Sequence, residues 1–598
     1  MIQRIGSLLK KFLDIYRTEG LARALKRGMQ NFEKLVPAIA FRRYRRWYEQ
    51  HEPSPQELKQ QRQLAQQMTQ PPLISVVIPV FNPPAAIFAQ TLDSVLSQTY
   101  PHWECCLANG DPSNPAIKDL IDQYARQEAR FKVVNLERNL GIAGNTNAAI
   151  AITAGAFIGF LDHDDLLAPF AMYEVALRLR SDSSVDLVYS DEDKVDDRGR
   201  RFFPYFKPDY SPDYLRSSNY ICHFLVVRKS IGDRVGWVRD GFEGAQDYDL
   251  ILRACEQARR IEHIPQVLYH WRTIQGSTAV DSNAKPYASA SGVKAINEHL
   301  HRVGLPGKAE SLSMPTSYRV RYELPRSPLV SILIPNHDHA ADLRKAIASI
   351  LKKTTYTNYE ILIIENNSNE PETNSLYEEL KNLDARIRVL EWQQPFNFAA
   401  VINWAVRETS GEMLLFLDND IEVITPGWIE ELLMHAARPG VGSVGGKLYF
   451  PNNTIQHAGV VVGEGEVAIH IYEGFSRDMT GHGMQLVLAR NVAANTSACM
   501  MVSKEVIDSV GGFDENYVLA YSDVDLCLKL LEAGCVNVWT PFAELYHISS
   551  NTHSYERTPT QLARLEADAA RFRQRWQTLL AQGDPCFNQN LQQGGLKL

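Results

Sequence analysis

Short apolar runs alternate with amphipathic segments over most of the chain, and this alternation predicts the fold class. The stretches "PLISVVIPVFNPP" at Pro72 and "PLVSILIPNHDHA" at Pro328 are rich in β-branched residues and contain a proline where the run ends, which is typical of short buried strands. Each is followed by a segment with helical spacing, "TLDSVLSQTYPHWE" or "AIASILKKTTYTNYE". The order strand, helix, strand, helix, strand predicts an α/β fold with a mostly parallel sheet and helices on both faces.

The same pattern occurs twice at a constant spacing. The anchors of this repeat, each pair 256 residues apart, are Pro79 with Pro335, Asn147 with Asn403, Asp162 with Asp418, and Asp164 with Asp420. Further along, Asp247 of "QDYDL" matches Asp523 of "SDVDL" at a spacing of 276, and His270 of "LYHWR" matches His547 of "LYHIS". The increase places an insertion of 20 residues in the second copy, after Asp420 and before Asp523. A chance acidic triplet would not keep this spacing, so the chain contains a duplicated domain.

A chain of 598 residues is too long for one hydrophobic core. The repeat and its flanks predict five parts, namely a basic amphipathic helical extension over 1–70, a first domain over 71–310, a linker over 311–327, a second domain over 328–560, and a C-terminal helix and tail over 561–598.

The net charge of −8 is unevenly distributed. Residues 1–48 contain twelve Lys or Arg against three acidic residues, and Ile2, Ile5, Leu9 and Phe12 recur at helical spacing. A helix of this kind can lie on the anionic inner surface of a membrane, or it can dock on the acidic body of the protein itself. Because that body is acidic, nucleic acid is not an expected partner.

Cysteine usage and hydropathy predict the compartment. Eight cysteines are scattered without a CxxC pair or a signal-peptide pattern, and the longest apolar run, 148–161, is too short to span a bilayer. We expect a cytoplasmic protein, which contacts the cytoplasmic face of the membrane peripherally if residues 1–48 bind lipid.

Acidic residues follow a predicted strand in each copy. In "GFLDHDD" these are Asp162 and Asp164, and in "LLFLDND" they are Asp418 and Asp420. Ligands of parallel sheets bind at the carboxyl ends of the strands. Clustered carboxylates repel one another unless a cation binds, and hard divalent ions prefer oxygen ligands. Two Asp and one His around a metal, with positions open for phosphate oxygens, would stabilise a leaving diphosphate.

A second carboxylate lies downstream in each copy, at Asp247 and Asp523, and is suited to take a proton from an incoming hydroxyl. Together the groups predict transfer from a nucleotide-diphosphate donor. Structural alternatives remain open: Asp247 and Asp523 as helix caps, and His270 as a core histidine. A further alternative is that Asp191, Glu192 and Asp193 compete as a metal site or form a charged loop near the acceptor.

These motifs resemble family 2 glycosyltransferases of the GT-A fold, a nucleotide-diphospho-sugar transferase fold of Rossmann-like type, present here in tandem as in bacterial enzymes of O-antigen and surface polysaccharide synthesis. In the first copy they are "SVVIPVFNP", "NLGIAGNTNAAI", "GFLDHDD", "VYSDEDKVD", "KPDYSPDYLRSSNYICHFLVVRK", "QDYDL" and "YHWR". In the second they are "SILIPNHD", "ILIIENNS", "PFNFAAVINWA", "LLFLDND", "KLYFPNNTIQHAGVV", "GGFDE", "SDVDLCLKL" and "LYH". The resemblance covers roughly 72–300 and 328–555.

The resemblance implies a metal-dependent inverting glycosyltransferase. It implies that Mn²⁺ or Mg²⁺ is held by Asp162, Asp164 and His270 in the first copy and by Asp418, Asp420 and His547 in the second, and that Asp247 and Asp523 are the catalytic bases. The positions it implies for donor binding are Pro79, Asn109, Asp111, Arg138, Asn139, Asn147, Asp162 and Arg272, and in the second copy Pro335, Glu365, Asn403 and Asp418.

The sequence departs from this pattern in two respects. Where the family often has Asp at the end of its second strand, this chain has Asn109 with Asp111 and, in the second copy, Glu365. The second copy also has Ser549 where the first has Arg272.

Both copies contain the Asp pair, the downstream Asp and the His, so we expect two active sites. The expected donor is a nucleotide-diphosphate sugar, and the expected acceptor is a polysaccharide or a lipid-linked glycan. One alternative is a single-site transferase whose other domain is a scaffold or acceptor-binding module. Another is a metal-dependent phosphohydrolase, because acidic clusters also serve two-metal hydrolysis.

Overall fold

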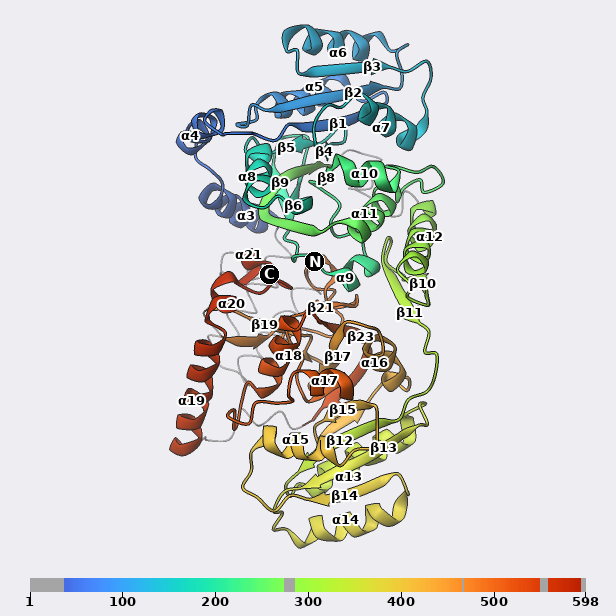
Figure 1. Ribbon diagram of the computed structural model, residues 1–598, viewed down its shortest axis with the longest axis vertical. Coiled ribbons are helices and arrows are strands. Elements are labelled where there is room, and N and C mark those ends of the chain that lie inside the picture. The colour runs from blue at the N-terminus through green and yellow to red at the C-terminus, as the bar shows by residue number, and fades with distance from the viewer. Residues whose placement is uncertain (1–36, 274–285, 465–466, 549–557, 593–598) are drawn as a thin grey trace, which may run out of the picture. The chain divides into compact units, whose positions relative to one another are not determined.

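The chain folds into two compact units, each built on one large sheet (Figure 1). The structure is a computed structural model and describes residues 37–273, 286–464, 467–548 and 558–592. By contacts, the first unit comprises Met1–Lys207, Ile221–Ser291 and Asn588–Leu598, and the second comprises Pro208–Tyr220 and Gly292–Phe587.

The N-terminal extension is helical from Pro37 onward, in α3 (Pro37–His51) and α4 (Pro55–Gln66). A capping box begins α4, in which the Ser54 hydroxyl accepts from the Glu57 backbone and the Glu57 carboxylate accepts from the Ser54 backbone. The amphipathic helix expected near the start of the chain lies outside the described residues.

The sheet of the first unit has the strand order β3-β2-β1-β4-β8-β6-β9-β5, with β7 paired to β6. Its first four strands are parallel, β8 is antiparallel to β4, and β6 is parallel to β9. The strands are β1 (Ile74–Val80), β2 (Trp103–Asn109), β3 (Phe131–Asn135), β4 (Phe157–Phe160), β5 (Leu166–Leu167), β6 (Val185–Val195), β7 (Arg201–Tyr205), β8 (Val226–Arg228) and β9 (Arg260–Arg272).

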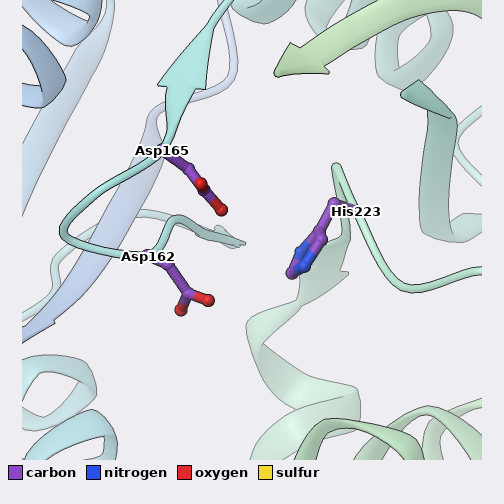
Figure 2. Close-up of side chains that lie close together, drawn as sticks. All are labelled: Asp162, Asp165 and His223. Carbon is purple, nitrogen blue, oxygen red and sulfur yellow. The ribbon is translucent and has the colours of Figure 1, made fainter. Parts of the chain in front are cut away.

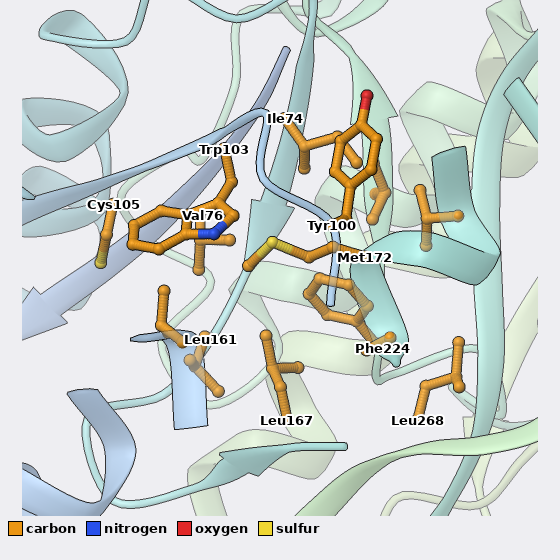
Figure 3. Close-up of a cluster of buried hydrophobic side chains, with 14 of the residues drawn as sticks. Ile74, Val76, Tyr100, Trp103, Cys105, Leu161, Leu167, Met172, Phe224 and Leu268 are labelled. Atoms are coloured by element: carbon orange, nitrogen blue, oxygen red, sulfur yellow. The ribbon is translucent and has the colours of Figure 1, made fainter. Parts of the chain in front are cut away.

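Helices cover this sheet on both faces. They are α5 (Ala85–Leu96), α6 (Pro115–Gln127), α7 (Gly141–Ala151), α8 (Ala171–Ser181), α10 (Lys229–Val235) and α11 (Gln246–Gln257). Alternate β1 residues Ile74 and Val76 enter a core with Trp103 and Met172 (Figure 3), whereas Val77 points to the opposite face and is also fully buried. A strand buried on both faces explains the continuous apolar run in the sequence.

A close approach before β4 is repeated in the second unit. The backbone N–H of Gly155 donates to the Ser75 hydroxyl, which itself donates to Glu104, and a Cβ at Gly155 would lie 2.4 Å from the Ser75 oxygen. Gly411 and Ser331 make the equivalent contact, with the same 2.4 Å obstruction. Glycine is therefore required at this point of both copies.

The sheet of the second unit has the order β14-β13-β12-β15-β22-β17-β23-β16, in which β18 pairs with β17 and β21 with β23. Its strands are β12 (Val330–Asn336), β13 (Tyr359–Glu365), β14 (Ile387–Glu391), β15 (Met413–Leu417), β16 (Ile421–Val423), β17 (Val441–Tyr449), β18 (Ile455–His457), β21 (Arg490–Val492), β22 (Cys499–Ser503) and β23 (Val536–His547).

The second unit has a corresponding set of helices and a C-terminal pair. They are α13 (Ala340–Lys353), α14 (Pro371–Leu383), α15 (Phe398–Arg407), α16 (Trp428–Ala436), α17 (Lys504–Ser509), α18 (Ser522–Glu532), α19 (Pro559–Arg575) and α20 (Gln577–Gln582). Phe572, Trp576 and Leu580 of the C-terminal pair are buried in a core shared with α15 and α18, so this part of the tail packs on the second unit.

The two sheets match strand for strand along their principal order. This confirms the expected fold class, two tandem α/β domains of the GT-A type with a helical N-terminal extension. The additional residues of the second copy lie between β17 and β22, where β18, β19 (Val460–Val462), β20 (Ala468–His470), a 3₁₀ turn (His482–Met484) and β21 occur.

The remaining elements are short or peripheral, namely α9 (Pro212–Ser217), α12 (Pro286–Arg302), β10 (Gly307–Ser311), β11 (Tyr318–Tyr322) and α21 (Gln589–Gln592). Among the helices described, none combines the length and the hydropathy needed to cross a membrane.

Candidate active sites

The first site begins where β4 ends and the chain turns into its acidic residues. Leu161 is buried and the next residue, Asp162, is exposed. The His163 ring nitrogen Nδ1 lies 3.0 Å from the Pro79 carbonyl oxygen, so the acidic turn adjoins the end of β1. Two strands of the parallel sheet thus end at this site, as expected for a ligand-binding edge.

Asp165 and Arg272 hold this turn in place. The buried Asp165 carboxyl accepts the Tyr269 hydroxyl at 2.6 Å and the Arg272 backbone N–H at 2.7 Å. The Arg272 guanidinium donates to the Asp164 carbonyl at 2.7 Å and to Gln90 at 2.9 Å. Burial, with the charges of Asp162 and Asp164, raises the pKa of Asp165 well above its ordinary value. Arg272, which was expected to contact the donor, is 3% exposed, and its guanidinium is hydrogen-bonded to the acidic turn.

Three metal-ligating groups face one another at this turn. Ligand atoms of Asp162, Asp165 and His223 all lie within 4.8 Å of one another, and Figure 2 shows the three side chains directed toward a common space. The imidazole of His223 stacks on Tyr269 with ring centroids 4.3 Å apart. Sequence reasoning assigned no role to His223, which lies within the motif "KPDYSPDYLRSSNYICHFLVVRK" but is not one of the repeat anchors.

The metal ligands expected in the first copy, Asp162, Asp164 and His270, do not form such a group among the described residues. Burial, followed by the charge of Asp162, raises the pKa of Asp164. His270 is 8% exposed, and its Nδ1 lies 2.6 Å from an oxygen of Asp193.

The acidic run from Asp191 to Asp193 was expected as a competing metal site or a charged loop, and the loop interpretation is wrong. These residues lie on β6 and are buried, at 0%, 6% and 1% exposure. They have partners from elsewhere in the chain: a ring nitrogen of His263 lies 2.9 Å from a carboxylate oxygen of Asp191, and the Lys207 ammonium lies 2.9 Å from Glu192.

Asp247 lies in the first turn of α11 near the acidic turn. Burial raises the pKa of its carboxyl, His223 lowers it, and Asp162 raises it further. The Cys222 thiol lies 3.9 Å from one of its oxygens. The cap of α11 is Ala245, so the helix-cap interpretation of Asp247 is wrong. A half-buried carboxyl with a raised pKa beside the acidic turn has the properties of a general base.

The other expected donor-binding positions of the first copy lie on loops after β2 and β3. Asn109 is fully buried and donates to Asn135, and it accepts the Asp111 backbone N–H. Asn139 accepts from Asn145 and from the Gly141 backbone.

Arg138 and Asn147 differ in their surroundings. The structure places Arg138 on the exposed surface. The Asn147 amide donates to the Val238 carbonyl at 2.8 Å and accepts the Val238 N–H at 3.2 Å. Asn403 makes the same pair of bonds to Phe513 at 2.9 Å each. In both copies this side chain is bound to the segment that leads to the helix carrying the candidate base.

The second site assembles the expected metal ligands. Ligand atoms of Asp418, Asp420 and His547 lie within 4.8 Å of one another, and His547 Nε2 lies 3.4 Å from Asp418 and 3.2 Å from Asp420. Burial raises the pKa of Asp418 to about 6, and the charges of Asp420 and Asp523 add to this rise against the effect of His547. Burial acts to lower the pKa of His547, but the bond to Asp420 and the charge of Asp418 raise it.

Asp523 lies in the first turn of α18, equivalent to Asp247 on α11. Its carboxylate accepts the backbone N–H groups of Ser497 at 3.1 Å and Val524 at 2.9 Å. Because Tyr521 is the cap of α18, the cap interpretation is wrong here too.

The expected donor-binding positions of the second copy lie at the ends of β12 and β13. Pro335 precedes Asn336, which accepts a hydrogen bond from Asn419 at 2.6 Å. Glu365 accepts the hydroxyls of Ser368 and Tyr377, so its carboxylate is held by the loop after β13 and by α14.

A divalent cation fits the two sets of ligands that the structure brings together, Asp162, Asp165 and His223 in the first copy and Asp418, Asp420 and His547 in the second. The groups are carboxylates and imidazoles, which are oxygen and nitrogen ligands suited to Mn²⁺. At the second site burial and then the charge of Asp420 raise the pKa of Asp418. A bound cation would offset the repulsion between these two carboxylates.

Each unit combines an α/β fold with an acidic centre near the carboxyl ends of its strands. The family model described as glycosyl transferase family 2 matches residues 75–236 and 331–511. The chain therefore belongs to glycosyl transferase family 2, which confirms the expected family.

Several curated proteins are similar to the chain. It is 42% identical over 535 residues to the uncharacterized protein y4gI of Sinorhizobium fredii, covering 88% of this chain and 58% of that protein. It is 38% identical over 590 residues to the O-antigen biosynthesis protein RfbC of Myxococcus xanthus, covering 98% and 45%. The chain thus spans about half the length of these relatives.

A solved structure with a distant likeness is GalNAc-T7 with UDP, GalNAc and Mn²⁺. It has a TM-score of 0.33 and 16% identity, over 40% of this chain and 47% of that chain.

Proposed function

We propose that the chain is a metal-dependent inverting glycosyltransferase with two active sites. It transfers sugars from nucleotide-diphosphate donors to a polysaccharide or lipid-linked oligosaccharide during synthesis of a surface glycan such as O-antigen or capsule. The observation that carries the proposal is the convergence of Asp418, Asp420 and His547 beside Asp523, at positions that all recur in the first copy. The relative named O-antigen biosynthesis protein supports the class of product.

In the second site Asp418, Asp420 and His547 would hold Mn²⁺ or Mg²⁺, which when bound neutralises the charge that develops on a leaving diphosphate. Asp523 takes the proton of the acceptor hydroxyl on its carboxylate. A single displacement on the face opposite the leaving group inverts the configuration of the sugar. Glu365 and Pro335 border the donor position through their loops.

In the first site we propose Asp162, Asp164 and His270 for the ion and Asp247 for the base. The Asp165 carboxyl is occupied by Tyr269 and Arg272, which favours a role in holding the turn. His223 lies within 4.8 Å of Asp162 and acts to lower the pKa of Asp247, and we propose that it contacts the donor or the acceptor.

Separate substitution of the two candidate bases tests whether both sites turn over. Because each carboxylate would act at its own centre, we expect Asp247→Asn to abolish one transfer and Asp523→Asn to abolish the other, each by a factor of about 10² or more. The donors are first identified by a thermal-shift screen of UDP-, dTDP- and GDP-sugars with Mn²⁺. Products are then resolved by mass spectrometry of the extended acceptor.

The matched controls are Glu256→Gln and Glu532→Gln, acidic residues near the ends of the same two helices. If one base variant removed both transfers and the other removed neither, a single-site enzyme with a scaffold domain would replace the proposal.

We also propose that residues 1–48 bind the cytoplasmic face of the membrane. Their excess of Lys and Arg supports attraction to anionic lipid. Full-length protein should sediment with vesicles containing phosphatidylglycerol at low salt, and deletion of residues 1–36 should reduce this. Equal sedimentation of both proteins would contradict it.

A further inference from the structure

Asp193 of the first unit is a buried carboxylate with three donors. It accepts the Tyr44 hydroxyl at 2.6 Å, the Arg201 Nε–H at 2.6 Å and His270 Nδ1–H at 2.6 Å. Its side chain has 0% exposure, and Arg201 is itself paired with Glu52.

The donors to Asp193 come from different parts of the first unit. Asp193 lies on β6 opposite His270 on β9, and Arg201 lies on β7. Tyr44 belongs to α3, which packs on β7 and places Phe41 beside Phe202 with ring centroids 5.3 Å apart. The N-terminal extension, outside the repeat, therefore completes the surroundings of His270, the histidine proposed above as a ligand of the first site.

The second copy lacks this arrangement. Tyr449 of β17 pairs with Tyr546 of β23, as Glu192 pairs with Tyr269, so the counterpart of Asp193 is the next residue, Phe450. Within the described residues, the buried Nδ1 of His547 has no hydrogen-bond partner, and its Nε2 faces the Asp pair. The two equivalent histidines therefore differ: His270 is held at Nδ1 by a carboxylate, and His547 is not.

We infer that Asp193 is a positioning residue of the first site and that Tyr44 of α3 completes it, so that this site depends on the N-terminal helix and the second does not. A carboxylate that accepts Nδ1–H fixes the tautomer in which Nε2 carries a lone pair. It also orients the ring through one of its two nitrogens and leaves the other available as a ligand. The inference rests on the proposed role of His270 in holding the ion.

Binding of Mn²⁺ alone, measured by titration calorimetry on the full chain, tests the inference without a substrate. Asp418→Asn with Asp420→Asn removes the second site, so that only the first titrates. In this background we expect Asp193→Asn to weaken Mn²⁺ binding about 10- to 100-fold, and Tyr44→Phe, which removes one hydroxyl, to weaken it less. In the opposite background, with Asp162→Asn and Asp164→Asn, the same two changes should leave the second site unaltered.

His270→Ala in the first background separates failure of the inference from failure of the proposed function. If it weakens Mn²⁺ binding while Asp193→Asn and Tyr44→Phe do not, the positioning role is wrong and the ligand role stands. If His270→Ala also changes nothing, the ligand assignment is wrong and the inference fails with it. Circular dichroism and the melting temperature check folding. Should Asp193→Asn unfold, Tyr44→Phe decides, and an unchanged affinity for that variant overturns the inference.

Discussion

Asp162 and Asp418 occupy equivalent positions, yet their neighbours differ. In the second copy the residue equivalent to Asp165 is Ile421, an apolar residue of β16, so only two carboxylates face His547. In the first copy Asp165 adds a third carboxyl, which Tyr269 and Arg272 stabilise. Duplication thus preserved the Asp-x-Asp and let the supporting groups diverge, and we expect the two sites to differ in metal affinity.

Asp584 predicts a pH dependence of stability at a position away from both sites. Burial raises its pKa to about 7, partly offset by the backbone N–H groups of Val462 and Cys586 and by the charge of Arg490. The folded form therefore binds this proton more tightly than the unfolded chain, whose pKa is near 4. The contribution to stability is complete below pH 4 and is lost as the pH rises to about 7.

The loss amounts to about 4 kcal/mol at most, from a shift of about three units. We expect the melting temperature of the second unit to fall between pH 5 and 8 by more in the wild-type chain than in Asp584→Asn, which has no such proton. Differential scanning calorimetry at several pH values measures this. Parallel curves for the two proteins would contradict the assignment.

At the scale of elements, C-terminal helix α19 holds the segment that leads into α18. The buried Asp568 carboxylate accepts the backbone N–H groups of Val518, Leu519 and Ala520 at 2.9 to 3.3 Å. Trp576 donates to Asp525 on α18 at 2.9 Å. In the first unit the counterpart of Asp525 is Asp249, which Arg239 and Arg253 of the same domain neutralise.

Removal of the Asp568 carboxylate should therefore affect the second site selectively. Asp568→Ala leaves three half-buried backbone N–H groups without this acceptor and should destabilise the segment 518–520 by about 1–3 kcal/mol. We expect faster hydrogen exchange of these amides and a slower second transfer, with the first transfer unchanged. Asp568→Asn, which keeps an acceptor oxygen, is the matched control. Unaltered exchange in the alanine variant would show that α19 does not order this segment.

Periodicity predicted the strands and helices of both sheets because their apolar residues are local signals. β1 reads as a buried strand from Ile74 to Val80, and α11 and α18 read as helices from their own residues. The environment of His270 was not predictable in this way, because Asp193 and its other donors, Tyr44 and Arg201, are far from it in the chain. His223 was missed for the related reason that its proximity to Asp162 depends on how β8 is paired.

At the scale of the whole molecule, the duplication is the strongest evidence for two centres. The strand order and the glycine approach before β4 and β15 recur in both units, and an Asp pair follows each of these strands.

The number of Mn²⁺ ions bound per chain tests the central claim most directly. The loss of the free Mn²⁺ signal in electron paramagnetic resonance, on titration into the full chain at neutral pH, counts bound ions. The proposal predicts two ions for the wild-type chain, one after Asp162→Asn with Asp164→Asn or after Asp418→Asn with Asp420→Asn, and none when all four are changed. A stoichiometry that these substitutions leave unchanged would contradict it.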